Sequence, residues 1–222
     1  MKLLIDSANI TKIEEILDYL PIEGVTSNPT ILKKEGQIDV VTHMNNIRHL
    51  IGKNRTLHIQ VIGTDYDSII EEASDILDKV DDKIHVKIPV TKNGMKAIKY
   101  LSTQGVNITA TAIYSAIQAI MAKEAGANYL APYVNRMENL NTNPFDVIEM
   151  VANNITLTQS HTRILAASFK NINQVLKANA SGASHVTVGP DIIDAFFYDK
   201  NIDGAVEAFK NDWIEIQNRD FF

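Results

Sequence analysis

Eight short apolar segments follow one another along the chain, and a stretch with helical periodicity separates each segment from the next. The short segments are rich in β-branched residues, whereas the longer ones repeat apolar residues at spacings of three and four. The predicted strands are 2–6, 24–27, 56–62, 83–89, 107–111, 129–133, 163–167 and 185–188. The predicted helices are 10–20, 40–51, 66–80, 94–103, 115–125, 144–156, 172–180, 193–198 and 203–218. This order predicts an α/β fold, a single (β/α)8 TIM barrel spanning residues 1–222.

Composition and motifs narrow the alternatives. A doubly wound open sheet is the other α/β possibility, but no G-x-G-x-x-G motif follows the first strand. A net charge of −6 disfavours a nucleic-acid surface, and the chain contains no run of about 18 apolar residues that would predict a membrane span. The absence of cysteine excludes disulfides and cysteine metal sites and agrees with a cytoplasmic location. The opening segment Met1–Asp6 is predicted to be a strand rather than a signal peptide.

The last predicted helix, 203–218, exceeds what eight strand–helix units need. Its apolar stripe must be buried against something. The stripe consists of Ala205, Val206, Phe209, Trp213 and Ile216. It could fold back over its own barrel or dock on a neighbouring subunit, and the sequence favours neither.

The fourth predicted strand carries a single lysine, Lys87, within the apolar run Ile84–Val90. Strands that are apolar on both faces belong to parallel sheets covered by helices, so this ammonium group is expected to be buried. Because burial penalises the charged form, the lysine must find a partner such as Asp6 or lose its proton. A neutral lysine is a nucleophile toward carbonyl carbon, which makes Schiff-base chemistry the leading hypothesis.

Strand alternation predicts which side chains face the inside of the barrel. On the third and fourth strands these are His58 with Gln60 and His85 with Lys87. At the carboxyl ends of the other strands, where barrel active sites lie, most inward positions are polar. The inward residues there are Asp6, Thr26, Asn28, Thr111, Ala131, Tyr133 and Ser168. Each has a purely structural explanation, but their convergence around one lysine predicts a catalytic pocket.

An anion site is predicted at the same end of the barrel. Arg136 follows the sixth strand, and Ser168 ends the seventh. A guanidinium group and a hydroxyl, completed by backbone N–H groups, suit a phosphate. The alternative for Arg136 is an ordinary surface arginine.

Four segments resemble motifs of the transaldolase family. Gly24–Thr30 (GVTSNPT) resembles its first signature, and Val86–Gly94, which contains Lys87, resembles its second. Ala131–Arg136 (APYVNR) and Leu165–Lys170 (LAASFK) are similar to segments of its short branch. That branch contains small transaldolases and fructose-6-phosphate aldolase, and the chain resembles the latter over essentially its whole length. The resemblance implies an enzyme that needs neither metal nor cofactor.

The resemblance also implies roles for individual residues. Lys87 would be the Schiff-base lysine, and the other catalytic residues would be Asp6, Gln60, Thr111 and Tyr133. Substrate binding would fall to Thr26, Ser27, Asn28, Ala131, Arg136 and Ser168. Gln60 and Tyr133 match the aldolase pattern, because transaldolases usually carry glutamate and phenylalanine there. A phenol near the reacting carbon can protonate the enamine and release dihydroxyacetone.

The implied reaction is the cleavage or formation of fructose 6-phosphate, with dihydroxyacetone and glyceraldehyde 3-phosphate as the other partners. One alternative is a transaldolase of the pentose phosphate pathway, which passes dihydroxyacetone between sugar phosphates such as sedoheptulose 7-phosphate and erythrose 4-phosphate. Another is a non-catalytic barrel that binds sugar phosphates as a regulator, although such a protein would be expected to have lost Lys87 or Asp6. The resemblance further implies a homo-oligomer, with pentamer rings paired as decamers and the last helix reaching a neighbour.

His58 and His85 depart from the apolar residues that are usual at these positions of the family. Both are expected to be neutral core histidines that share hydrogen bonds one layer below Gln60 and Lys87. The alternative is a tuning role, since a charged histidine near Lys87 would lower the pKa of the lysine. The other four histidines show no ligand-type spacing on one face, so the sequence predicts no metal site.

Overall fold

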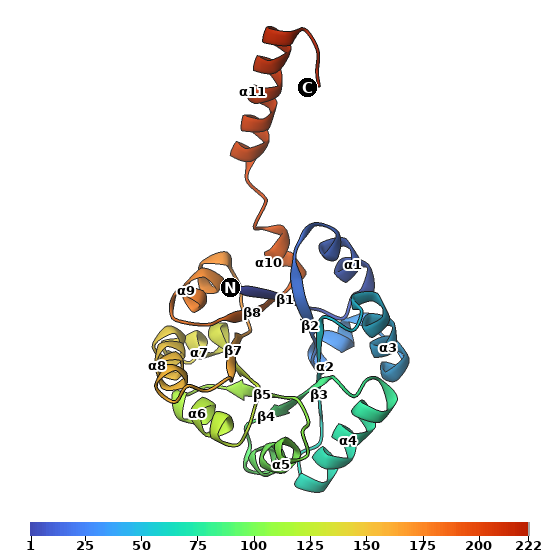
Figure 1. Ribbon diagram of the computed structural model, residues 1–222, viewed down its shortest axis with the longest axis vertical. Coiled ribbons are helices and arrows are strands. Elements are labelled where there is room, and N and C mark those ends of the chain that lie inside the picture. Colours follow the sequence, from blue (N-terminus) through green and yellow to red (C-terminus); the bar gives the residue numbers. More distant parts are fainter. Residues whose placement is uncertain (222) are drawn as a thin grey trace.

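The strands form a closed parallel barrel in the computed structural model, which describes residues 1–221 (Figure 1). Neighbouring strands pair in chain order, and β8 closes the barrel on β1 through pairs such as Leu3 with Val186. The strands are β1 (Lys2–Asp6), β2 (Ile22–Thr26), β3 (Thr56–Gln60), β4 (His85–Pro89), β5 (Ile108–Ile113), β6 (Tyr129–Pro132), β7 (Arg163–Ala166) and β8 (His185–Val188). The TIM barrel predicted from the sequence is confirmed.

Helices surround the barrel and cover the outward faces of its strands (Figure 1). They are α1 (Ile10–Tyr19), α2 (Pro29–Leu32), α3 (Val40–Ile51), α4 (Tyr66–Lys79), α5 (Lys92–Thr103), α6 (Ala116–Glu124), α7 (Val134–Asn139), α8 (Pro144–Leu157), α9 (Ile172–Ala180), α10 (Pro190–Asp194) and α11 (Lys200–Gln217), with a 3₁₀ turn η1 (Lys33–Glu35) after α2. The short elements α2, η1 and α7 were not predicted. They follow β2 and β6 and shape the carboxyl-terminal end of the barrel.

The helix predicted over 193–198 was wrong in position. The structure places α10 at Pro190–Asp194, because Pro190 occupies the first turn, where its missing N–H costs nothing. The final helix begins at Lys200, three residues before the predicted start, because the Asp199 side chain accepts a hydrogen bond from the Asn201 backbone N–H and caps it.

Most helices start at a polar cap. The capping side chains accept hydrogen bonds from backbone N–H groups two or three residues ahead. They are Asn9, Asn28, Asp39, Asp65, Thr91, Asn143 and Asn171. At the start of α5, a Cβ on Gly94 would collide with the carbonyl oxygen of Pro89. Glycine therefore lets α5 pack tightly against the end of the strand that carries Lys87.

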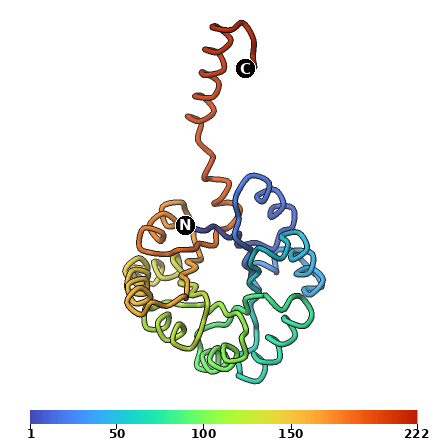
Figure 2. The backbone as a smooth tube through the Cα atoms, viewed as in Figure 1, coloured from blue at the N-terminus to red at the C-terminus, as the bar shows by residue number. Residues whose placement is uncertain are grey.

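Helix α11 extends away from the barrel as an arm, and the C-terminal end lies at its far tip (Figures 1 and 2). None of its residues is buried, and apolar side chains such as Val206, Phe209 and Ile216 are more than half exposed. Helix α11 therefore does not fold back over its own barrel, which was one of the two placements considered from the sequence.

A layer of rings fills the amino-terminal half of the barrel interior. His58 and His85 stack with ring centroids 4.6 Å apart, and Tyr129 meets both of them and His185 edge-on at 5.0–5.3 Å. The expectation that the two stacked histidines share hydrogen bonds was wrong, since His58 bonds to the hydroxyls of Thr109 and Thr56 instead. The sequence did not predict that His185, on β8, is part of this layer.

Candidate active site

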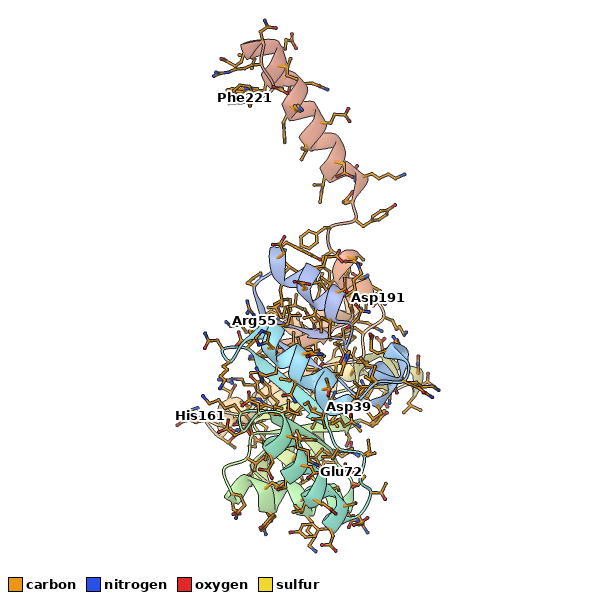
Figure 3. The ribbon with its side chains drawn as sticks, turned by 90° about the vertical axis from the view of Figure 1, so that its right-hand side faces the viewer. Asp39, Arg55, Glu72, His161, Asp191 and Phe221 are labelled. Atoms are coloured by element: carbon orange, nitrogen blue, oxygen red, sulfur yellow. The ribbon has the colours of Figure 1, made fainter. Side chains whose placement is uncertain are left out.

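A cavity of about 410 Å³ opens at the carboxyl ends of the strands. Six predicted site residues line it: Asp6, Asn28, Lys87, Tyr133, Arg136 and Ser168. Asp191 lies on its wall. In Figure 3 Asp191 is on the opposite side of the molecule from Arg55 and His161, which lie just before the first residues of β3 and β7. The cavity therefore occupies the end at which barrel enzymes place their chemistry.

Lys87 lies at the floor of this cavity, in the middle of β4. Lys87 is only 2% exposed, and its Nζ donates a hydrogen bond to the carbonyl oxygen of Ser27 at 3.5 Å. Within residues 1–221 it forms no ion pair. The predicted burial is confirmed, and a buried amine without a close carboxylate is available to react with a substrate carbonyl.

Asp6, at the end of β1, shares the cavity with Lys87. Its Oδ1 accepts a hydrogen bond of 2.6 Å from the Thr26 hydroxyl, which lies 2.6 Å from the hydroxyl of Thr187. Burial raises the pKa of the Asp6 carboxyl, while the charge on Lys87 and the Thr26 hydrogen bond act in the opposite direction. A carboxyl in this setting suits proton transfer, because it takes up a proton more readily than an exposed aspartate does.

The segment after β2 contributes Asn28 but not the Ser27 side chain. The Asn28 side-chain oxygen caps α2 through the Ile31 N–H at 3.1 Å, while the residue lines the cavity. The Ser27 hydroxyl lies 4.0 Å from Sδ of Met44, on the helix side of the sheet, and only its carbonyl faces Lys87.

Tyr133 lines the cavity and contacts Thr111, which is fully buried and does not line it. The Thr111 hydroxyl donates to the phenol oxygen of Tyr133 at 3.0 Å, so the phenol keeps its own proton for a substrate or a water molecule. Ala131 is buried in β6 and is not among the residues that line the cavity.

Gln60 lies on the wall of a second cavity of about 280 Å³, beside the ends of β3 and β4. Its Oε1 is buried and has no hydrogen-bond partner within the described chain. A buried acceptor without a partner costs folding free energy, so this oxygen is expected to accept a hydrogen bond from a hydroxyl or a water molecule.

Arg136 and Ser168 come together as predicted. Ser168 has a left-handed backbone (φ 64°), and its carbonyl accepts the Asn135 N–H at 2.8 Å, which ties β7 to the start of α7. The exposed Arg136 guanidinium lies 4.7 Å above the ring centroid of Tyr133. Both residues line the cavity and present groups that bind anions.

Several cavity residues were missed by sequence reasoning. Thr187 stands two residues after His185 on β8, so strand alternation alone could have placed it. Lys34 and Lys170 add cations to the cavity wall, and the charge of Lys34 favours the ionised form of Asp6. Lys34 lies on the three-residue turn η1, which is too short to leave a periodic signal.

These features define a (β/α)8-barrel protein whose carboxyl-terminal cavity is built around a buried lysine, a carboxyl and an arginine. Comparison with known proteins gives the family. A profile of the transaldolase/fructose-6-phosphate aldolase family matches residues 3–220, and the chain belongs to this family. It is therefore an enzyme of the transaldolase family, as the sequence motifs implied.

Individual relatives cover almost the whole chain. A probable fructose-6-phosphate aldolase of Streptococcus pneumoniae is 46% identical over 218 residues, which is 98% of each chain. A probable transaldolase of Clostridioides difficile is 35% identical and covers 96% of this chain and 97% of its own. A probable transaldolase of Desulforapulum autotrophicum is also 35% identical and covers 99% and 100%. No helix within the described residues has the length and hydropathy needed to span a bilayer.

Proposed function

We propose that the chain is a class I aldolase that cleaves and forms fructose 6-phosphate through a Schiff base on Lys87. The observation that carries the proposal is the buried Lys87 amine, which has no ion pair within the described residues and faces the same cavity as Asp6 and Tyr133. The likeness to a probable fructose-6-phosphate aldolase, at 46% identity, supports the same choice.

The first half of the reaction forms the iminium. Neutral Lys87 attacks the C2 ketone of open-chain fructose 6-phosphate to give a carbinolamine. The carbinolamine hydroxyl takes up a proton from solvent and leaves as water, which gives a cationic iminium, and hydrolysis at the end of the cycle returns that proton to solvent. Asn28, which lines the cavity, orients the sugar hydroxyls, and Thr26 acts on the substrate through its hydrogen bond to Asp6. The partnerless Oε1 of Gln60, on the wall of the second cavity, holds the water that is exchanged. The iminium then acts as an electron sink for the C3–C4 bond of the sugar.

Carbon–carbon cleavage follows. Asp6 accepts the proton of the C4 hydroxyl, the C3–C4 bond breaks, and its electrons pass into the iminium to give an enamine. Glyceraldehyde 3-phosphate leaves as the aldehyde. The raised pKa of Asp6 suits this step, because the carboxyl takes up a proton more readily than an exposed aspartate.

Release of dihydroxyacetone needs a proton at C3 of the enamine. Tyr133 supplies it directly or through a water molecule, since Thr111 donates to its oxygen and leaves the phenol proton free. Water then hydrolyses the new iminium, which frees dihydroxyacetone and Lys87, and protonated Asp6 returns a proton to Tyr133. Arg136 and Ser168 hold the phosphate at the outer end of the cavity.

The test is release of glyceraldehyde 3-phosphate from fructose 6-phosphate, with and without erythrose 4-phosphate. We expect steady release without the acceptor, matched by an equal amount of free dihydroxyacetone. Release that appears only with erythrose 4-phosphate would assign the chain to the second candidate, a transaldolase. That candidate has a specific basis, because two relatives at 35% identity are named probable transaldolases.

We also propose that the protein is a homo-oligomer in which the α11 arm docks on a neighbouring copy. The arm exposes Ile202, Val206, Phe209 and Ile216 and covers nothing of its own barrel. A chain ending at Tyr198 should therefore sediment as a smaller species than the full chain while its barrel keeps the same circular dichroism. Equal sizes for the two chains would contradict the docking of the arm.

A further inference from the structure

Tyr114 stands between β5 and α6, next to the cavity but outside every role assigned so far. Its backbone N–H donates to Oε1 of Gln118 at 2.8 Å, within the first turn of α6. The backbone just before it is also constrained, because Ala112 adopts a left-handed conformation (φ 56°) where the pairing of β5 with β6 shifts register. The residue is therefore held on two sides and only half-buried.

The Tyr114 ring belongs to a three-part stack with Tyr133 and Arg136. The two tyrosine rings meet edge-on, with centroids 5.8 Å apart and planes at 74°. On the Tyr133 ring lies the Arg136 guanidinium, 4.7 Å from the centroid. The Tyr114 phenol is close enough to the guanidinium to raise the pKa of Arg136 through side-chain hydrogen bonding. Tyr114 thus contacts both the proposed proton donor and the proposed phosphate ligand.

The Arg136 side chain is exposed and flexible, so it needs a partner that holds its guanidinium in one position. No ion pair fixes it among the described residues, and its ring contact alone leaves the guanidinium free to slide over Tyr133. The Tyr114 ring packs against Tyr133 and so fixes the surface on which the guanidinium lies. Hydrogen bonding with the Tyr114 phenol, the main cause of the raised pKa of Arg136, restrains the guanidinium further. A side chain that is already ordered binds a ligand more tightly than one that must be ordered on binding.

We propose that Tyr114 is a positioning residue that holds Arg136 in place for the phosphate of the substrate and so sets the preference for phosphorylated aldehydes. This inference rests on the proposed function, since it takes Arg136 as the phosphate ligand. It gives Tyr114 no direct contact with the reacting carbon atoms.

The experiment compares glyceraldehyde 3-phosphate with glyceraldehyde as acceptor, each with dihydroxyacetone as donor. Tyr114→Phe keeps the ring and removes the hydrogen bond. We expect its KM for glyceraldehyde 3-phosphate to rise about tenfold, the usual effect of losing one hydrogen bond to a charged group, with kcat changed less than about twofold. The KM for glyceraldehyde should keep its wild-type value, because that aldehyde has no phosphate.

Tyr100→Phe is the matched control, since Tyr100 forms the same edge-on pair with Tyr66 at 6.3 Å on the outside of the barrel. It should leave both KM values unchanged. In the Arg136→Ala background, Tyr114→Phe should add nothing, because the group it positions is gone.

Three outcomes would overturn the role of Tyr114. These are an unchanged KM for glyceraldehyde 3-phosphate in Tyr114→Phe, an equal rise for both aldehydes, and a full additional effect in the Arg136→Ala background. Failure of the underlying function has a different signature. In that case the wild-type and Arg136→Ala enzymes would themselves treat the two aldehydes alike.

Discussion

Replacing Lys87 with methionine should abolish turnover of fructose 6-phosphate and at the same time make the protein more stable. The loss of activity should be on the order of a thousandfold or more, because the other two lysines of the cavity, Lys34 and Lys170, are exposed and cannot take the place of the buried amine on its floor. The gain in stability should be about 1–3 kcal/mol, because an apolar side chain of similar length replaces a buried amine that has no ion pair within the described residues. Activity assays and urea unfolding at pH 7.5 measure the two effects.

A second buried lysine provides the control. Lys123 is 7% exposed, like Lys87 nearly buried, but its Nζ donates to Asn154 at 2.7 Å and to Thr158 at 2.8 Å and pairs with Glu124. Lys123→Met should therefore lose about 1–3 kcal/mol of stability and keep full activity, since it breaks satisfied hydrogen bonds far from the cavity. The two substitutions are chemically identical, so opposite signs separate a functional lysine from a structural one.

Borohydride trapping identifies the covalent intermediate. The wild-type protein incubated with fructose 6-phosphate and borohydride should gain the mass of a reduced ketose or dihydroxyacetone adduct on the peptide that contains Lys87. Lys87→Met should gain none, whereas Lys123→Met should be labelled like the wild type. An adduct on any other lysine would contradict the scheme.

Strand alternation explains why so much of this site could be predicted. A barrel strand has only two faces, so Lys87 and Gln60 followed from counting by twos once the strands were found. The same count places Ser27 opposite Thr26, and the structure indeed sends the Ser27 hydroxyl toward Met44 rather than into the cavity. Ser27 was included in the predicted site only because it belongs to the GVTSNPT motif, although strand alternation points its side chain away from the cavity.

What sequence reasoning missed lies where no periodicity exists. Tyr114 and Lys34 stand in connections between elements, and their positions depend on the turn geometry at Ala112 and η1. No residue of the α11 arm is buried against the rest of the described chain, so an apolar stripe could be predicted but not what covers it. Only His58 and His85 of the histidine layer were predicted to lie together. His185 joins them when β8 closes against β1, and the sequence pattern does not show this.

That layer should make the protein sensitive to acid well above the pH at which most barrels unfold. Burial lowers the pKa of His85 and His185 to about 4, and that of His58 well below its ordinary value. The charges of Arg163 and Arg48 act on His85 in the same direction, and Lys87 acts so on His58. Around His185, Arg163, Lys2 and the N-terminus also lower the pKa, and only Glu23 opposes them.

The sign of the effect follows from proton uptake. In the unfolded chain a histidine has a pKa near 6.5, so between pH 6.5 and 4 the unfolded state binds more protons than the folded one. Stability is therefore complete above pH 6.5 and falls as the pH drops toward 4. At pH 5.0 the loss is about 2 kcal/mol each for His85 and His185, or about 4 kcal/mol together, which is a large part of the stability of a typical domain. The lowered pKa of His58 acts in the same direction. The raised pKa of Asp6 offsets a part of this, because the folded state takes up that proton more readily.

Urea unfolding at pH 7.5 and pH 5.0 measures the loss, and His85→Leu tests its source. Nδ1 of His85 is buried and has no hydrogen-bond partner among the described residues, so leucine breaks no such bond there and removes one site of proton uptake. The variant should lose about 2 kcal/mol less than the wild type between the two pH values. His161→Gln, which changes an exposed histidine just before β7, should lose as much as the wild type. A wild-type protein whose stability differs by less than about 1 kcal/mol between the two pH values would show that the histidines are protonated inside the folded barrel, because only equal proton binding in both states makes stability independent of pH.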